Sequence, residues 1–201
     1  SVHNIVGIDL GMNFLAVSYD SAGKTSFFEG RHIKDKRAKF AKTRKSLQQT
    51  KTASSRRRLK KLGNRENRWM TDTNHKVSKA LVYGNKECTL FVIEDLTGIR
   101  SQTERVQRQD RYYSVSWAFY QLREMIEYKA LRSGSKVIAV DPKYTSQTCP
   151  KCGHTEKANR NKNTHTFICK TCTYTSNDDR IGATNLQRKG IEYIAEVMLS
   201  V

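Results

Sequence analysis

Four of the five cysteines in the 201-residue chain have the spacing of a metal site. They form two C-x-x-C pairs separated by 16 residues: Cys149, Cys152, Cys169 and Cys172. Two thiolates on one tight turn can share a tetrahedral Zn2+, and a second such turn completes the coordination. Because four thiolates leave no open position on the ion, we expect one structural zinc that folds a zinc ribbon and does not catalyse. A redox dithiol is the alternative.

The zinc site needs no ligand besides these four cysteines. Gly153 follows the first pair, where glycine suits a turn with positive φ. Cys88 lies in an apolar run, so we expect a core thiol there. His154 and His165 are expected to be solvated side chains, with a role as spare ligands as the alternative. Cysteines used as metal ligands fit a reducing compartment.

Acidic side chains end two apolar runs. Asp9 ends "NIVGID" and Glu94 ends "CTLFVIE", while "NDDRIGATN" places Asp178 and Asp179 at the start of a predicted helix. One Asp next to Gly commonly caps a turn, but a second strand that ends in an acid indicates a shared site. If these elements lie side by side, three carboxylates converge and repel one another unless divalent cations bind them. A pair of such ions can activate a water against a phosphodiester.

Strands and helices alternate along the chain around these side chains. Three short extended runs in residues 4–30 predict an antiparallel meander, and "CTLFVIEDL" and "KVIAVDP" predict two more strands. Helical composition and spacing cover residues 34–83, "SVSWAFYQLREMIEYKALRSG" and the C-terminal stretch. The C-terminal helix, or pair of helices, is predicted from the spacing of Ala183, Leu186, Ile191, Ile194 and Met198. We therefore expect an α/β domain with a small inserted module.

The chain is strongly basic. Its formal net charge of +18 and pI near 9.9 predict a polyanionic partner, with nucleic acid favoured over an anionic membrane. No apolar run approaches the roughly 20 residues of a membrane span, and no signal-peptide pattern is present, so we expect a soluble intracellular protein.

Much of the excess charge lies in residues 34–68, where 15 basic residues face two acidic ones. We expect this segment to bind a nucleic-acid backbone, with a solvated helical face as the alternative. The expected backbone contacts are Arg56, Arg57, Arg58, Lys60 and Lys61 in this segment, and Arg105, Arg108 and Arg111 beyond Glu94.

The stretch "GIDLG" permits a second interpretation. It resembles the first phosphate loop of the actin and heat-shock ATPase superfamily, in which Asp and Gly hold Mg-ATP. That superfamily needs a second D-x-G loop and a long second lobe, and this sequence has neither. Glu94 and the paired cysteines favour a nuclease instead.

Five motifs, in order, carry a more specific resemblance: "GIDLGMNFLAV", "SRRRLKKLGNRENRWMTDTNHKVSKALV", "FVIEDLTGIR", "DPKYTSQTCPKCGH" and "DDRIGATNL". Together they resemble the RuvC-like nuclease half of TnpB, the transposon-encoded RNA-guided DNA endonuclease, and of the compact type V CRISPR effectors. The resemblance implies an RNase H-like (RuvC) α/β fold, in which a mixed sheet with flanking helices carries an inserted zinc ribbon. Residues 1–143 and 178–201 would form the nuclease domain, and residues 144–177 the ribbon.

The resemblance also implies the roles of particular residues. Asp9, Glu94 and Asp179 would be three catalytic acids that bind two Mg2+ ions, with Mn2+ as a substitute. Asp179 is preferred over Asp178 because the last acid of the family precedes an A-x-N step, here 183–185, by four residues. Arg160 resembles an arginine that family members place near the scissile phosphate.

The implied activity is metal-dependent cleavage of single-stranded or unwound DNA, with a guide RNA in the full assembly, in the prokaryotic cytoplasm at the nucleoid. Family members carry an N-terminal half that binds the guide and opens the duplex, whereas this sequence begins shortly before the first catalytic strand. We therefore expect a missing half or a partner chain to supply recognition. The alternative is a non-cleaving nucleic-acid-binding module or regulator, against which the three intact acids argue.

Overall fold

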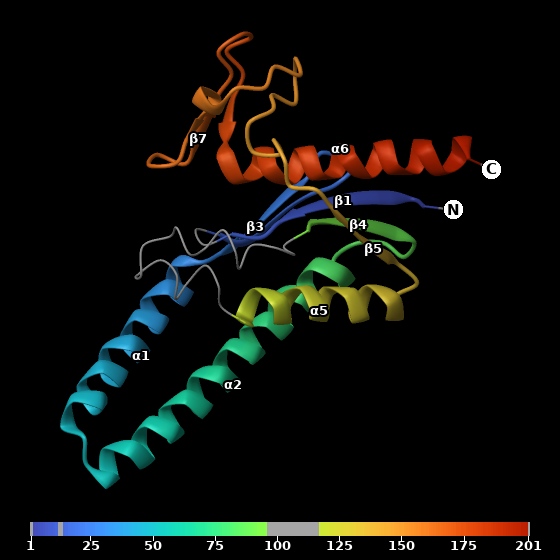
Figure 1. Ribbon diagram of the computed structural model, residues 1–201. Helices are drawn as coiled ribbons and strands as arrows, with labels where there is room; N and C mark the ends of the chain where they lie inside the picture. Colours follow the sequence, from blue (N-terminus) through green and yellow to red (C-terminus); the bar gives the residue numbers. More distant parts are fainter. Residues whose placement is uncertain (1, 12–13, 96–116, 201) are drawn as a thin grey trace.

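A five-stranded mixed sheet forms the centre of the protein (Figure 1). The computed structural model describes residues 2–11, 14–95 and 117–200. The strand order is β3-β2-β1-β4-β5. The strands are β1 (Asn4–Asp9), β2 (Phe14–Tyr19), β3 (Thr25–Glu29), β4 (Thr89–Glu94) and β5 (Lys136–Val140). The first three form the predicted antiparallel meander, and β4 pairs in parallel with both β1 and β5.

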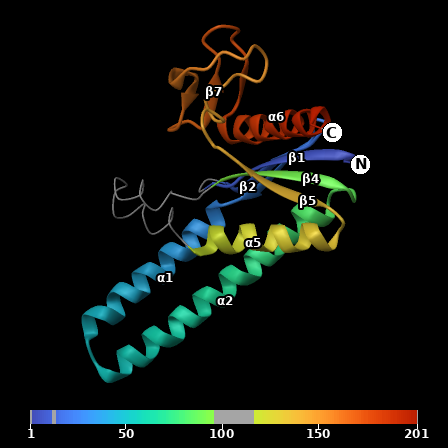
Figure 2. The same cartoon turned by 45° about the vertical axis from the view of Figure 1, so that its right-hand side comes forward.

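Helices cover both faces of this sheet (Figures 1 and 2). On one face lie α2 (Ala53–Tyr83) and α5 (Trp117–Arg132), and on the other lies α6 (Asp178–Leu199). Strand β4 is buried on both sides because a central parallel strand contacts helices above and below. Phe91 and Ile93 join the core toward α2 and α5, whereas Leu90 and Val92 pack with Leu186 of α6.

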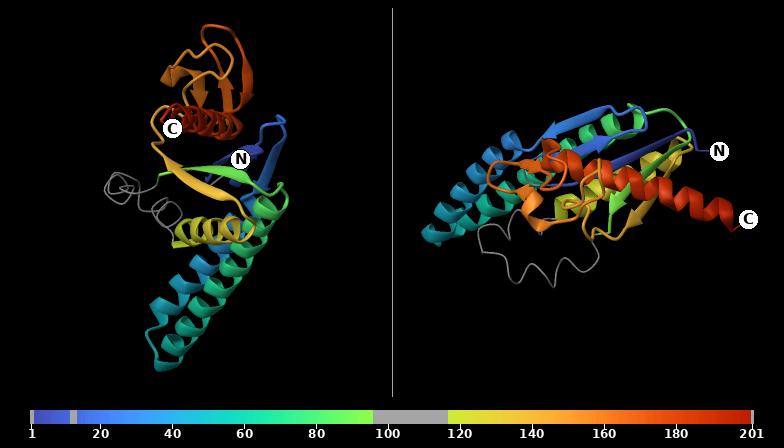
Figure 3. Two further views of the ribbon diagram at one scale, coloured as in Figure 1. Left: turned by 90° about the vertical axis from the view of Figure 1, so that its right-hand side faces the viewer. Right: turned by 90° about the horizontal axis from the view of Figure 1, so that it is seen from above.

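Helices α1 (Arg31–Thr50) and α2 form a hairpin that projects from the body of the protein (Figures 1 and 3). With 31 residues, α2 is about 46 Å long. Glu66 is buried between the two helices, where it pairs with Arg44 and lies 3.9 Å from Arg37. Thr52 caps α2 by accepting a hydrogen bond from Ser55 N. The basic segment of residues 34–68 is therefore two antiparallel helices with an exposed tip.

Helix α6 approaches β1 closely. A side chain at Gly7 would collide with the backbone of Ala183 and Gln187, so only glycine permits this spacing. A Cβ on Gly190 would meet Val92 at 2.6 Å. The sequence accordingly forms a single C-terminal helix that carries small residues on the face toward β1.

The cysteine module, residues 144–177, lies over the N-terminal end of α6 (Figure 1). Its three-stranded antiparallel sheet contains β6 (Arg160–Asn161), β7 (Thr166–Ile168) and β8 (Thr175–Asn177). A short 3-10 helix, η2 (Lys157–Asn159), leads into β6. Strand β8 continues directly into α6, so the module is joined to this helix without a linker.

One expectation about the fold is wrong. Cys88 is exposed and is not a core thiol. It precedes β4 with a φ of 57°, and its carbonyl accepts a hydrogen bond from His3 N, so it belongs to the turn before the strand. Among the described residues, no helix combines the length and the apolar character needed to cross a membrane.

Candidate active site and metal centre

Asp9 and Glu94 lie at the same edge of the sheet. They directly follow Ile8 and Ile93, which are paired in the parallel register between β1 and β4. The carboxyl ends of neighbouring parallel strands meet at one edge, so the two acids are brought together although they are far apart in sequence.

The N-terminal turn of α6 brings two more acids to this edge. The side chain of Asn177 caps the helix by accepting hydrogen bonds from Asp179 N (3.0 Å) and Arg180 N (3.1 Å). Asp178 and Asp179 then occupy the first turn, where the helix dipole favours negative charge. A Cβ on Gly182 would lie 2.6 Å from Asp9 Oδ2, so the Asp9 carboxylate touches this turn. We call Asp9, Glu94, Asp178 and Asp179 the carboxylate cluster.

The electrostatics of the carboxylate cluster favour a bound cation. Burial raises the pKa of Asp9 well above its usual range, and the charges of Glu94 and Asp179 raise it further, while Arg160 opposes the shift. Burial also raises the pKa of Glu94, against the hydrogen bond from Thr145 and the charge of Arg160. Carboxylate oxygens are typical ligands of Mg2+ and Mn2+. A divalent ion bound between these carboxylates would offset their repulsion and lower both pKa values.

The loop after β5 holds Glu94 in place. Thr145 Oγ1 donates a hydrogen bond of 2.9 Å to Glu94 Oε1. Asn185 on α6 in turn donates to the carbonyl oxygens of Thr145 (2.6 Å) and Thr148 (2.8 Å). In the sequence, Asn185 serves only to align the last acid. Its hydrogen bonds to this loop are evident only in the structure.

Arg160 reaches the carboxylate cluster from the cysteine module. Its Nε donates to Asp178 Oδ2 at 2.8 Å, and one terminal nitrogen lies 3.5 Å from Asp179 Oδ1. The Asp178 side chain is fully buried, so this charge-assisted hydrogen bond fixes the guanidinium firmly. The predicted residues Asp9, Glu94, Asp179 and Arg160 thus lie together, and Asp178 is an additional member with a different partner.

The four paired cysteines converge on one point. Their sulfur atoms all lie within 4.8 Å of one another, with Cys149 Sγ 3.6 Å from Cys172 Sγ and Cys152 Sγ 3.5 Å from Cys169 Sγ. These separations are far longer than a disulfide of about 2.05 Å. They are close to the roughly 3.8 Å between ligands of a tetrahedral Zn2+ with bonds of about 2.3 Å. The donor set therefore fits one zinc ion.

Two similar turns present these thiols. Cys149 N and Cys169 N each donate to the carbonyl five residues later, both at 2.9 Å. Gly153 and Thr173 occupy the same place in the two turns, with φ values of 77° and 57°. Burial alone would raise the pKa of Cys169, but backbone N–H groups of the second turn donate to its sulfur and help lower that pKa to about 6. A thiolate is the form that binds a metal.

Asn159 connects the two turns to Arg160. Its buried side chain donates to the carbonyls of Gln147 (3.1 Å) and His154 (3.4 Å) on the first turn. Its Oδ1 accepts from Lys170 N on the second turn at 2.9 Å. Since Arg160 is the next residue, the fold of the thiolate site sets the position of this arginine. No signal in the sequence indicated this role.

The predicted nucleic-acid contacts fall into two groups. Arg56, Arg57, Arg58, Lys60 and Lys61 are all exposed near the tip of the hairpin, at the end of the protein away from the cysteine module (Figure 1). Arg105, Arg108 and Arg111 lie outside the described residues.

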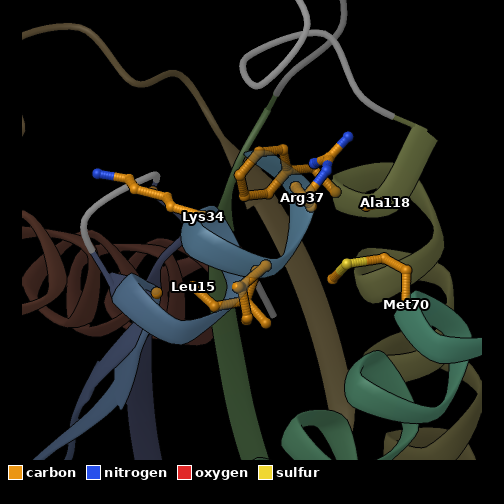
Figure 4. A pocket seen from close by; sticks show the side chains of 9 residues that line it. Leu15, Lys34, Arg37, Met70 and Ala118 are labelled. Atoms are coloured by element: carbon orange, nitrogen blue, oxygen red, sulfur yellow. The ribbon is translucent and has the colours of Figure 1, made fainter. Parts of the chain in front are cut away.

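A small pocket at the base of the hairpin is not part of this site (Figure 4). Leu15, Met70 and Ala118 line it, and Lys34 and Arg37 lie at its rim. Its volume of about 30 Å³ is close to that of one water molecule, so it does not accommodate a nucleotide.

Two family models match separate parts of the chain. The model described as a probable transposase matches residues 2–98, and the model described as "Cas12f1-like, TNB domain" matches residues 119–186. The CRISPR-associated endodeoxyribonuclease Cas12f1 of Sulfoacidibacillus thermotolerans is 32% identical over 96% of this chain and 47% of its own length. The chain is a homologue of the Cas12f and TnpB-like proteins.

Further relatives match nearly the whole chain at a similar level of identity. The putative RNA-guided DNA endonuclease InsQ of Escherichia coli is 32% identical over 96% of this chain and 50% of its own length. The TnpB-like protein MJ0751 of Methanocaldococcus jannaschii is 29% identical over 92% of this chain and 69% of its own length. The chain thus spans about half the length of the Cas12f1 and InsQ relatives.

Solved structures support the fold. The protein in a Cas12f1–sgRNA–target DNA complex matches with a TM-score of 0.74 and 19% identity, over 93% of this chain and 50% of that one. A second match, to a CRISPR-Cas12f ternary complex, has a TM-score of 0.72 and 20% identity over 93% of this chain and 39% of the other. The mixed α/β architecture is therefore that of Cas12f proteins.

Proposed function

We propose that the chain is the catalytic half of an RNA-guided DNA endonuclease, with an RNase H-like (RuvC) nuclease domain in residues 1–143 and 178–201 and a zinc ribbon in residues 144–177. The observation that carries this proposal is the carboxylate cluster, in which acids from β1, β4 and α6 meet at one edge of the sheet. Relatives named as endodeoxyribonucleases support the same reaction class.

In this proposal Asp9, Glu94 and Asp179 hold two Mg2+ ions, or Mn2+ in their place. Such a pair supplies a water activated as nucleophile and stabilises the leaving oxygen of a phosphodiester. The residues around the cluster position it: Thr145 fixes Glu94 through a hydrogen bond, and Gly182 leaves room for the Asp9 carboxylate. The enclosed site raises the strength of every charge interaction made there.

Arg160 would act on the substrate directly. Its Nε is held by buried Asp178 and one terminal nitrogen lies 3.5 Å from Asp179 Oδ1, which leaves the other terminal nitrogen to donate to a phosphate oxygen. Donors held in place before reaction stabilise the charge that develops on phosphate in the transition state. The zinc would be structural, because it fixes the module that carries this arginine.

The hairpin tip would bind a nucleic-acid backbone away from the carboxylate cluster. Five exposed cations in the first turns of α2 supply charge but no sequence recognition. A helix about 46 Å long separates this tip from the sheet, so both regions would contact one extended partner. Sequence recognition would come from base pairing with a guide RNA. This agrees with the similar Cas12f1, which is solved as a complex with sgRNA and target DNA, and with InsQ, which is named as a putative RNA-guided endonuclease.

Cleavage of single-stranded DNA by the purified chain in Mg2+ tests this proposal. Asp9→Ala, Glu94→Ala and Asp179→Ala should each abolish nicking and leave DNA binding largely intact. Asp72→Ala is the matched control, since this exposed acid on α2 pairs only locally with Lys76. Nicking by Asp9→Ala at the parent rate would end the nuclease assignment. DNA binding without any nicking by the parent, alone or with the missing half supplied, would favour a non-cleaving module.

A further inference from the structure

One buried oxygen of the carboxylate cluster accepts no hydrogen bond from the described residues. Asp178 Oδ2 accepts the hydrogen bond from Arg160, but Asp178 Oδ1 accepts none from any residue that the structure describes. The Asp178 side chain has no exposed surface. A buried charged oxygen without a partner costs free energy, so a ligand is expected at Oδ1.

The imidazole of His165 faces this oxygen. Its Nδ1 lies 3.6 Å from Asp178 Oδ1, which is too long for a hydrogen bond, and this buried nitrogen also has no hydrogen-bond partner in the described part of the chain. The His165 backbone is nevertheless fixed, because its carbonyl accepts from Asp178 N and from Asn177 Nδ2, both at 3.3 Å. The turn between β6 and β7 therefore holds the ring over the first turn of α6.

These two groups and Asp179 form a compact set of ligands. One ligand atom from each of His165, Asp178 and Asp179 lies within 4.8 Å of the other two. Octahedral ligands with bonds of about 2.2 Å are about 3.1 Å apart when adjacent and about 4.4 Å apart when opposite, and the 3.6 Å between Nδ1 and Oδ1 falls between these values. The Arg160 hydrogen bond to the other oxygen of Asp178 is the outer-shell contact that ligating carboxylates commonly receive.

We propose that His165, Asp178 and Asp179 form a third metal site, in addition to the four thiolates and the Asp9–Glu94–Asp179 site, and that it binds a first-row transition-metal ion such as Mn2+. An imidazole nitrogen favours such an ion over Mg2+, which prefers oxygen ligands. The inference rests on the proposed function in one respect, since Asp179 would belong to both sites. Mn2+ would then bind the site that includes His165, whereas Mg2+ would bind only the site made of carboxylates.

Pulsed EPR of Mn2+ bound to the full zinc-loaded chain tests this site directly. Echo-envelope modulation from a directly bound imidazole nitrogen should be present in the parent and absent in His165→Gln. Mn2+ affinity should fall at least about tenfold in His165→Gln and in Asp178→Asn, while Mg2+ affinity should stay unchanged in His165→Gln. The matched control is His154→Gln, because His154 lies in the same module but pairs with Glu156, away from the cluster.

A measurement on the parent chain avoids dependence on a variant that misfolds. Labelling all histidines with 15N should replace the 14N modulation of bound Mn2+ by that of 15N. Mn2+ that binds without any nitrogen modulation would overturn the inference and show that His165 and Asp178 form only an ion pair. Failure of the proposed function looks different, because Asp9→Ala would then nick DNA at the parent rate whatever the EPR result.

Discussion

The thiolate cluster and the carboxylate cluster are both groups of like charges, but they are assembled in different ways. Two similar local turns present all the sulfurs, and backbone N–H groups of the second turn favour the thiolate of Cys169. The carboxylates come from β1, β4 and α6, and their burial, together with the charges of Glu94 and Asp179, raises the pKa of Asp9. A locally built site depends on its metal to fold, whereas a site built on a rigid sheet keeps its fold without metal.

Zinc removal should have the largest effect on stability, with the unfolding confined to the cysteine module. Binding of structural zinc is worth about 10–16 kcal/mol in small zinc modules, so Cys169→Ser should unfold residues 144–177. Elemental analysis should find one zinc per parent chain, and limited proteolysis should cut the variant within the module. Cys88→Ser is the matched control, since Cys88 is exposed in a turn. A zinc-free parent that resists protease equally well would refute the structural role.

Gly7→Ala should damage the carboxylate cluster and leave the thiolates intact. The new methyl group would meet the backbone of Ala183 and Gln187, which cannot move independently of α6. We expect a loss of about 3 kcal/mol in the free energy of unfolding, measured by urea denaturation, with nicking lost and zinc content unchanged. Gly63→Ala is the control, because nothing lies within 4 Å of a Cβ there. Equal stability of the two variants would show that β1 and α6 are less tightly packed than described.

Asn159→Ala tests whether the two clusters are independent. It removes three hydrogen bonds that join the cysteine turns, at about 1 kcal/mol each, so the module should lose about 2–3 kcal/mol of stability but keep its zinc. Because Arg160 is the next residue, nicking should fall with little change in the KM for DNA. Asn163→Ala, in an exposed turn of the same module, is the control. Unchanged kcat would mean that Arg160 is positioned by Asp178 alone.

Asp9→Asn should stabilise the metal-free protein at neutral pH. A carboxyl whose pKa is raised on folding binds more protons in the folded state, so stability falls as pH rises from the unfolded pKa of about 3.9 through the raised pKa. An Asn side chain does not ionise, so the variant does not lose this stability. The loss in the parent is about 1.4 kcal/mol for each unit by which folding raises the pKa. Thermal melts of the zinc-loaded chain without added Mg2+, at pH 4 and pH 8, should therefore diverge from the parent only at the higher pH, and Mg2+ should raise the Tm of the parent alone. Asp72→Asn serves as the control.

Charge removal at the hairpin tip should affect neither cluster. Arg56→Gln, Arg57→Gln and Arg58→Gln together should leave stability and zinc content unchanged, because these side chains are exposed. The slope of log affinity for DNA against log salt should flatten by up to about one unit per lost phosphate contact. Competition with unrelated oligonucleotides should show no sequence preference. Tight, salt-insensitive binding to one duplex sequence would contradict this role.

The two clusters differ in how much of each could be predicted from the sequence. The spacing of the cysteines predicts which four residues cluster, because each C-x-x-C pair is presented by one local turn. The acids could be selected from strand ends and from the family resemblance, but Asp178 could not be assigned to Arg160 without the fold. Neither the close approach at Gly7 nor the hydrogen bonds of Asn159 leave a pattern in the sequence, since the first joins elements that are distant along the chain and the second depend on how the cysteine module folds.

Local sequence patterns gave wrong predictions of burial for residues near the end of a strand or on the outer side of a helix. Cys88 shares an apolar run with β4 but falls one residue outside the strand, in a turn. Ile191 and Met198 continue the helical spacing of α6, yet both are exposed. Ile191 lies on the outer side of the helix, since its neighbour Gly190 faces the sheet, and Met198 lies near the end of the helix, which runs on past the sheet (Figure 3). Periodicity identifies a helix correctly but does not show how much of its length has a partner.

The packing of α6 on β1 has a consequence for the order in which the domain assembles during synthesis. The ribosome releases β1 before α6, the helix that brings Asp179 to Asp9 and the last element described in the chain. Contacts between such distant segments form late in folding, since the loop between them must close first. A nascent chain would therefore bind nucleic acid through its basic hairpin before it had a complete set of acids, and cutting would begin only after α6 had docked.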